Sequence, residues 1–525
     1  MLDLSLLRAQ PARVRAALER RGVGAERVDA AVDLDRRWSA RREMREALRT
    51  RRREISDEVA RRKSSAGAED AAEDAAPDLV RAGRRAGRDL KAVEGAMGDL
   101  SARREAALLA LPNLPAPDVP ETPPAPDPSG PPWPHAFPPL AHWDLVTMLH
   151  LVETAEASAG SGFLLWRGAG ARLVRGLVRF MLQVHTGEGG REEVLAPPVA
   201  TRRALAGSAH LPTLEEMLYA VVEPGGAREH GEKRGGSPHP PRDAQDERGR
   251  CGDRPRKSVG GASDADLFLA PRAEPHLATL YAGEVLEARR LPVRLAAAAT
   301  ALRHTPHGGG AAGRGLLRLR AFPTVEVYTL CRPAESDAEL ERALAGAETI
   351  LGRLEVAHRR RVRGATELSH AAARSVSLDV WCPGLPAEED DHERGGSPHP
   401  PRGAHGERGR YGDPPRNSGD TGSRAAGPET CRAESAPGAR GRWVEVTVLS
   451  SFTDYQARRT GTQYRDADGR SRLVHTVGGA AVAVPRLVAA ILETGQGADG
   501  AVRLPAALEP YVGTAVLGAP DGAAR

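Results

Sequence analysis

The sequence predicts an α+β protein in which a helical hairpin precedes a domain of strands and helices. Three observations support this class. Residues 26–64 and 78–111 have the apolar spacing of long helices, and the last third of the chain contains strand-like runs. Two tracts rich in glycine, proline and arginine interrupt the chain and predict disordered insertions. With 525 residues the chain has room for two or more domains.

The two long helical patterns predict an antiparallel coiled-coil hairpin that projects into solvent. Apolar residues of the second pattern recur at spacings of three and four, at Leu90, Val93, Met97 and Leu100. The first pattern is poorer in apolar residues and contains the run Arg51, Arg52 and Arg53. These arginine-rich faces suit a nucleic-acid backbone, and the alternative is that they are simply solvated.

Composition excludes several classes of protein. The net charge is only +4, so a polyanionic partner would have to bind local basic patches. The four cysteines are far apart, which indicates neither a zinc knuckle nor a disulfide framework. No apolar run approaches the roughly 20 residues of a membrane span. The amphipathic, arginine-rich residues 1–22 resemble an organellar leader, but Asp3 and Glu19 are unusual there, so we expect the first helix of the folded protein.

The middle of the chain predicts a linker followed by a second domain. Residues 112–140 are too rich in proline for a helix or a central strand. The second domain is expected from about His142, with a helix over 170–185 and a strand-like run over 192–200. The motif RGGSPHPPR occurs at 234–242 and again at 394–402, inside the two predicted insertions.

The stretch Leu302–Glu326, LRHTPHGGGAAGRGLLRLRAFPTVE, predicts a basic hairpin that approaches a ligand closely, because glycines tolerate positive φ. Its returning segment LLRLRAF alternates apolar and basic residues, as a strand does. Arg303 is expected to face Arg314 and Arg318 and form a platform for a polyphosphate, while Phe322 offers a stacking surface for a base. An ordinary basic hairpin with a flexible tip is the alternative.

The last third predicts further regular elements. VSLDVWCPG (376–384) and RWVEVTVL (442–449) are expected to be strands, with the second repeat tract in the loop between them. LVHTVGGAAVAVPRLVAAILET (473–494) is expected to be a glycine- and alanine-rich turn entering a helix, with Pro485 near the first helical turn.

Across nearly its whole length the chain resembles the seryl-tRNA synthetases, which are class II aminoacyl-tRNA synthetases. The resemblance is carried by MLDLSLLRAQPARVRAALERRGV, LPNLPAPDVP, GSAHLPTLEEMLYAV, TDYQARR and AVPRLVAAILET. It implies a tRNA-binding arm over 1–111, a linker over 112–140, a catalytic domain over 141–515 and a tail over 516–525. The disordered insertions would fall at about 224–262 and 387–440.

The resemblance also implies a catalytic antiparallel sheet flanked by helices and a homodimer with Pro197 in its interface. The implied reaction uses ATP and Mg²⁺ to convert L-serine to seryl-adenylate and then transfers the seryl group to tRNA(Ser), with selenocysteine tRNA as a further family substrate. TDYQARR and AVPRL are similar to organellar members, which favours the mitochondrial matrix; a cytoplasmic location is the alternative.

The family's pattern assigns roles to individual residues of this chain. It implies that Arg303 and Arg318 hold phosphates, that Phe322 stacks on adenine and that Arg486 clamps ATP. A further set of carboxylates is implied to bind the other ligands: Glu274 and Glu326 the serine amino and hydroxyl groups, and Glu445 the metal and ATP.

Several positions depart from the family's pattern, mainly in the serine half. Arg272 and Thr305 stand where the family has a small hydroxyl residue and a carboxylate, and Arg320 stands where a histidine is common. Val448, Gly478 and Ala480 replace polar residues. We therefore keep two hypotheses: a serine–tRNA ligase, and a non-catalytic synthetase-like dimer that binds RNA through its arm.

Overall fold

The structure of the protein is a computed structural model that describes residues 1–66, 77–123, 130–131, 136–221, 267–304, 315–386 and 440–518. The two repeat tracts, Thr305 and Arg314 lie outside the described residues. Within the described ranges, no helix combines the length and the apolar character that crossing a membrane requires.

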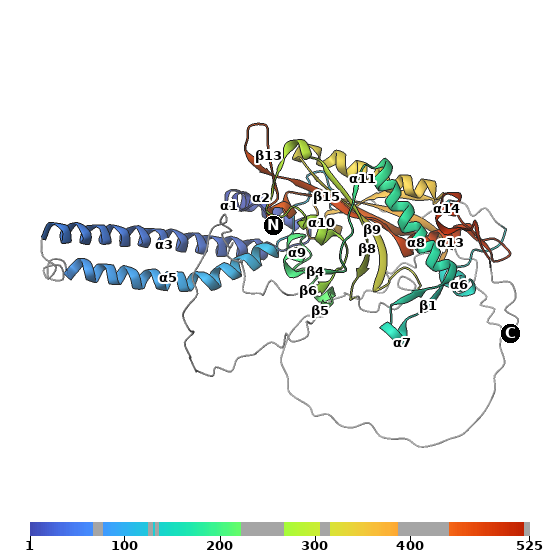
Figure 1. Cartoon of the computed structure of the whole chain (residues 1–525), viewed down its shortest axis with the longest axis horizontal. Helices are drawn as coiled ribbons and strands as arrows, with labels where there is room; N and C mark the ends of the chain where they lie inside the picture. Colours follow the sequence, from blue (N-terminus) through green and yellow to red (C-terminus); the bar gives the residue numbers. More distant parts are fainter. Residues whose placement is uncertain are drawn as a thin grey trace, which may run out of the picture.

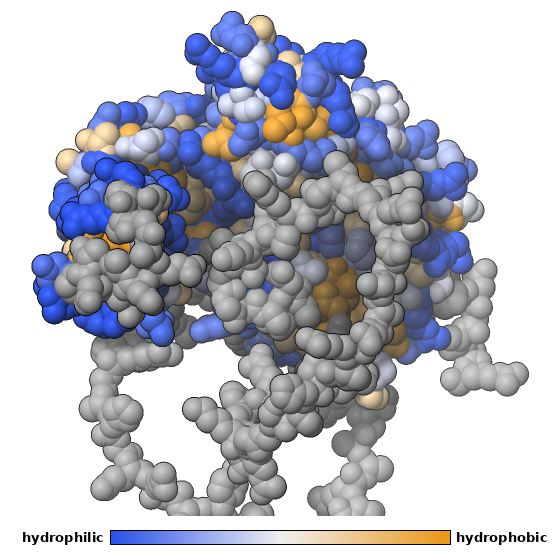
Figure 2. Space-filling model, turned by 60° about the vertical axis from the view of Figure 1, so that its left-hand side comes forward, coloured by the Kyte–Doolittle hydropathy of each residue, from blue (hydrophilic) through white to orange (hydrophobic). Residues whose placement is uncertain are grey.

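Two long antiparallel helices project from the body of the molecule and confirm the predicted hairpin (Figure 1). They are α3 (Ala25–Ala66) and α5 (Pro77–Leu109), which pack along each other. Ile55, Leu90, Val93 and Met97 are buried between them, as the spacing of three and four predicts. The three consecutive arginines 51–53 are exposed on α3. Figure 2 shows a largely hydrophilic surface on this side of the molecule, broken by smaller apolar patches.

The first 22 residues pack against the body and form two short helices rather than one. They are α1 (Leu4–Ala9) and α2 (Pro11–Glu19). The chain breaks between them because Pro11 has no N–H to continue a helix and is tolerated in a first turn. The Met1 amino group donates to the Tyr455 carbonyl at 2.6 Å, and Arg21 donates to the Ser369 carbonyl at 2.7 Å.

A seven-stranded sheet with the order β10-β11-β12-β15-β9-β8-β3 forms the centre of the body. All neighbours pair antiparallel except β3 and β8, which run parallel. The strands are β3 (Glu192–Glu193), β8 (Val293–Leu302), β9 (Ala321–Cys331), β10 (His358–Val362), β11 (Arg374–Pro386), β12 (Arg440–Thr453) and β15 (His475–Ala483). The predicted strands at 376–384 and 442–449 are confirmed as β11 and β12, which pair directly.

Helices cover the two faces of this sheet with separate hydrophobic cores. One core joins the sheet to α8 (Gly168–Gln183), α11 (Ser336–Arg353) and α13 (Val484–Gly495). The other joins the opposite face to the first two helices, α10 (Glu274–Thr279) and α12 (Tyr455–Thr460). Fully buried Leu177 and Leu487 belong to the first core and Tyr328 to the second. The central strands alternate along their length: Val376, Leu378 and Val380 of β11 belong to the first core, whereas the polar Ser377 and Asp379 between them face the opposite side of the sheet.

Smaller elements complete the fold at the edges of the sheet. The short helices are α6 (His142–Met148), α7 (Glu156–Ala159), α9 (Arg202–Gly207) and α14 (Glu509–Val512). The short strands are β1 (Val152–Thr154), β2 (Leu164–Trp166), β4 (Val199–Thr201), β5 (Ala220–Val221), β6 (Leu267–Leu269), β7 (Val285–Glu287), β13 (Gln463–Arg465), β14 (Ser471–Leu473), β16 (Val502–Arg503) and β17 (Val516–Leu517). The strand-like run at 192–200 is thus divided between β3 and β4, with Pro197 and Pro198 between them.

Two sequence predictions about local structure are wrong. The segment Leu316–Arg320 is not a strand, since β9 begins only at Ala321. Its backbone groups bond elsewhere: the Leu316 N–H donates to Nε2 of His142 at 3.1 Å, and the Leu317 carbonyl accepts from Arg486. The hairpin itself is confirmed, because Leu302 pairs with Ala321.

The second wrong prediction is the glycine-rich turn at 475–483, which is the central strand β15. Gly479 has φ +144, and a Cβ there would lie 2.2 Å from the Val448 carbonyl oxygen on β12. A Cβ at Gly478 would lie 2.8 Å from the ring of Tyr328 on β9. These glycines therefore allow close contact with both neighbouring strands. The expected helix after the segment is confirmed as α13, with Pro485 in its first turn.

Candidate active site

A cavity of about 830 Å³ lies on the sheet, between β9, β12 and β15 and the loops that follow α9 and precede α10. Every described residue that the sequence analysis placed in the ATP and serine sites lines it: Glu274, Arg303, Arg318, Phe322, Glu326, Glu445 and Arg486. These residues come from four stretches of the sequence, at 274, 303–326, 445 and 486. The structure brings them into one cavity, whereas the arm's arginines 51–53 are not part of its lining.

Arg303 places a partly desolvated cation in this cavity. It directly follows β8, where its N–H donates to the Arg320 carbonyl at 2.8 Å. Its Nε is buried and has no hydrogen-bond partner among the described residues. Burial lowers the pKa of Arg303 to about 10, with a further contribution from nearby Arg272. A buried N–H donor without a partner favours an anionic ligand.

Arg486 fixes the relative positions of three segments. From the first turn of α13 it donates through Nη1 to the Glu445 carbonyl on β12 at 2.6 Å, and through Nε to the Leu317 carbonyl at 3.2 Å. Burial lowers its pKa. Arg318, next to Leu317, is exposed at the same cavity. The Arg318 guanidinium therefore reaches the cavity from the loop before β9, and the Arg486 guanidinium reaches it from α13.

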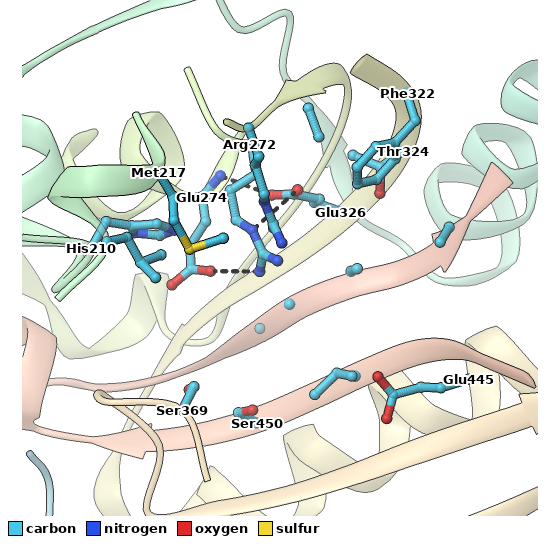
Figure 3. Close-up of a pocket in the computed structure, with 18 of the residues that line it drawn as sticks. His210, Met217, Arg272, Glu274, Phe322, Thr324, Glu326, Ser369, Glu445 and Ser450 are labelled. Atoms are coloured by element: carbon cyan, nitrogen blue, oxygen red, sulfur yellow. Dashed lines mark hydrogen bonds and ion pairs between the residues drawn. The ribbon is translucent and has the colours of Figure 1, made fainter. Parts of the chain in front are cut away.

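At another part of the cavity, two buried glutamates flank Arg272 (Figure 3). Arg272 lies 3.3 Å from a carboxylate oxygen of Glu274 and 3.8 Å from one of Glu326. Oε2 of Glu326 accepts the Glu274 N–H at 2.8 Å, at the start of α10. Burial raises the pKa of Glu326. The two predicted serine-site carboxylates are thus close together, but both contact a cation of the protein.

Gln456 is fully buried and supports the site from outside the cavity lining, a role that the sequence did not suggest. Its Nε2 donates to Oε1 of Glu274 at 2.8 Å, and its Oε1 accepts from Tyr328 and Thr476, also at 2.8 Å each. The segment TDYQARR, which contains Gln456, carried part of the family resemblance. The sequence therefore contained a signal for this residue, but not its contact with Glu274.

Glu445 lies on β12, on the opposite side of the cavity from Glu274 (Figure 3). Its carboxylate forms an ion pair with Arg361 at 3.3 Å and a shorter one with Arg363. Asp379 is its register partner on β11, and burial raises the pKa of that carboxyl. The side chain of Val448, further along β12, supplies no oxygen. The described residues contain no cluster of three or more histidine, cysteine or acidic side chains suited to a metal.

Comparison with known proteins identifies the family. Residues 1–115 match the family model "Seryl-tRNA synthetase N-terminal domain", and residues 260–495 match "tRNA synthetase class II core domain (G, H, P, S and T)". A serine–tRNA ligase of Gemmatimonas aurantiaca is 32% identical over 98% of this chain and 100% of its own length. The chain belongs to the seryl-tRNA synthetase family. The members of this family are aminoacyl-tRNA ligases, so this chain is an aminoacyl-tRNA ligase.

Further relatives are similar to this chain over nearly its full length. The serine–tRNA ligase of Pelotomaculum thermopropionicum is 29% identical, covering 98% of this chain and 99% of its own. Among solved structures, seryl-tRNA synthetase from Pyrococcus horikoshii, complexed with ATP, has a TM-score of 0.71 at 23% identity and covers 98% of this chain and 99% of its own. The shared fold of this family includes both the helical arm and the antiparallel sheet.

Proposed function

We propose that the protein is a serine–tRNA ligase that activates L-serine with ATP and transfers the seryl group to tRNA(Ser). The observation that carries the proposal is a single cavity with cations at one part and two carboxylates at another. The names of the full-length relatives support the substrate, and the ATP complex of the structural neighbour supports the nucleotide.

The first step suits the cationic part of the cavity. A carboxylate oxygen of serine attacks the α-phosphorus of ATP, the bond to the β,γ-phosphates breaks, and pyrophosphate leaves with its electron pair. Arg303 and Arg318 would stabilise the charge that develops on the phosphoryl oxygens, and Arg486 would hold the nucleotide. Phe322, half-buried at the start of β9, offers its ring to adenine.

In the second step a hydroxyl at the 3′ end of tRNA attacks the seryl carbonyl carbon, and AMP leaves. Glu274 and Glu326 would orient serine through its ammonium and hydroxyl groups. The exposed arginines 51–53 would bind tRNA phosphates on the arm. Selenocysteine tRNA as a substrate, a homodimer with Pro197 at its interface, and a mitochondrial-matrix location stay predictions.

The predicted Mg²⁺ has no resident site among the described side chains around Glu445. The side chains around Glu445 do not build a resident metal site, because two arginines already contact this carboxylate and Val448 offers no ligand. In the proposed reaction the protein therefore contributes no metal of its own. Mg²⁺ would enter with ATP, whose phosphate oxygens and waters supply most of its ligands.

The proposal is tested by measuring serine-dependent ATP–pyrophosphate exchange and the charging of tRNA(Ser) with the purified full-length protein. We expect both activities. Replacing arginines 51–53 by glutamine should reduce charging at limiting tRNA but leave the exchange unchanged, because the exchange does not require tRNA. Tight tRNA binding without any exchange would support the alternative, a non-catalytic RNA-binding dimer, which the comparisons do not favour.

A further inference from the structure

We propose that Arg272 competes with the ammonium group of the amino-acid substrate for Glu274 and Glu326, and that it thereby sets the amino-acid affinity of the cavity. The inference rests on the proposed function for the location of the amino acid. It concerns a residue of this chain that departs from the small hydroxyl expected at its position.

All four carboxylate oxygens of the glutamate pair already have partners within the chain. Oε1 of Glu274 accepts from Gln456 at 2.8 Å, and its Oε2 lies 3.3 Å from Nη1 of Arg272. Oε2 of Glu326 accepts the Glu274 N–H at 2.8 Å, and its Oε1 lies 3.8 Å from Nε of Arg272. The two oxygens that face Arg272 are therefore the ones that an incoming ammonium group would need.

The charges around the pair are balanced without a substrate. Arg272 and Arg303 carry two positive charges, and Glu274 and Glu326 carry two negative charges when ionised. Burial acts to lower the pKa of Arg272, but the carboxylates of Glu326 and Glu274 outweigh it and raise that pKa. An ammonium group that entered this balanced site would be an uncompensated buried cation, which is costly.

The position of Arg272 also allows a substrate ammonium group to displace its side chain. Arg272 lies two residues before the start of α10, so its backbone is close to Glu274 in the chain and its side chain reaches across to Glu326. Its Nε is buried yet lacks a hydrogen-bond partner among the described residues, because 3.8 Å is an ion-pair distance and not a hydrogen bond. Arg272 therefore occupies the ammonium position without satisfying all of its own donors.

The test is direct binding, which requires no catalysis. Isothermal titration of the full-length protein uses two probes: a stable seryl-sulfamoyl analogue of seryl-adenylate, and the same analogue without its amino group. We expect Arg272→Thr to tighten binding of the amino-bearing probe by at least about tenfold and to change binding of the amine-free probe less than about twofold. Arg272→Lys, which keeps a cation, should resemble the wild type with both probes.

An equal change for both probes in Arg272→Thr, or no change for either, would overturn the inference, because the effect would then be steric or absent. If Arg272→Thr lacks a cooperative unfolding transition, Arg272→Met replaces it, since Met keeps a long apolar side chain without the charge. The proposed function is judged separately by charging of tRNA(Ser). If the protein does not charge tRNA(Ser) but Arg272→Thr tightens only the amino-bearing probe, the proposed function alone is rejected. If the protein charges tRNA(Ser) normally but Arg272→Thr does not distinguish the two probes, only the role of Arg272 is rejected.

Discussion

Gly479 lies at a crowded backbone position of the site, where β12 and β15 pair. Its φ of +144 is strained for a residue with a side chain, and an added Cβ would lie 2.2 Å from the Val448 carbonyl oxygen. We expect Gly479→Ala to lower the free energy of unfolding by about 2–4 kcal/mol. Denaturation in urea measures this change.

A second glycine provides the matched control. Gly98 lies within α5, and nothing is within 4 Å of a Cβ added there. Gly98→Ala should therefore be neutral or stabilise by up to about 1 kcal/mol, through helix propensity alone. If Gly479→Ala were as stable as Gly98→Ala, the contact between Gly479 and β12 would not constrain the strand.

At the residue scale, the sequence predicted which side chains meet but not how they pair. Arg303, Phe322 and Glu445 were assigned from local patterns and resemblance, and all line one cavity. The contact of Arg272 with Glu326 joins residues that are distant in the sequence, so no local pattern contains it. Gly478 and Gly479 suggested a turn because glycine is common in turns, whereas here it is the neighbouring strands that require the absence of side chains.

Among the elements, the strand pairs that flank the repeat tracts have their ends close together. Val221, the last residue of β5, pairs with Leu267, the first of β6. Pro386 likewise pairs with Arg440 across β11 and β12. Each tract therefore enters and leaves the fold at neighbouring residues, as a hairpin loop does.

We expect that residues 222–266 can be replaced by a short Asn-Gly turn with little effect on folding. Two antiparallel strands with paired ends can be joined by a two-residue turn, and a shorter loop costs less closure entropy. The midpoint of thermal unfolding should change by less than about 3 °C. Loss of the cooperative transition, or of soluble protein, would show that the tract contributes to the fold.

The helical arm was the element predicted most completely. Its interface depends on contacts at spacings of three and four within one helix, which are visible in the sequence. α3 continues to Ala66 although its own apolar residues are sparse, since α5 supplies the partner surface. The order of the seven strands depends on long-range pairing, and only the family resemblance suggested an antiparallel sheet in advance.

At the scale of the whole molecule, two cores on opposite faces of one sheet give the body its stability, and buried ionisable groups give that stability a pH dependence. His185 follows α8 in the first core and is 1% exposed, and its Nε2 has no hydrogen-bond partner among the described residues. Burial, assisted by nearby Arg191, lowers the pKa of His185 to about 3. In the unfolded chain its pKa is about 6.5.

The sign of the pH effect follows from these two pKa values. Between about pH 6.5 and pH 3 the unfolded chain binds a proton at His185 that the folded protein does not, so the free energy of unfolding falls as the pH falls. His185 alone should remove about 2 kcal/mol between pH 7 and pH 5. His185→Leu should therefore lose less stability than the wild type over this interval, as measured by urea denaturation at each pH. An unchanged pH slope in His185→Leu would mean that the buried imidazole is protonated in the folded protein.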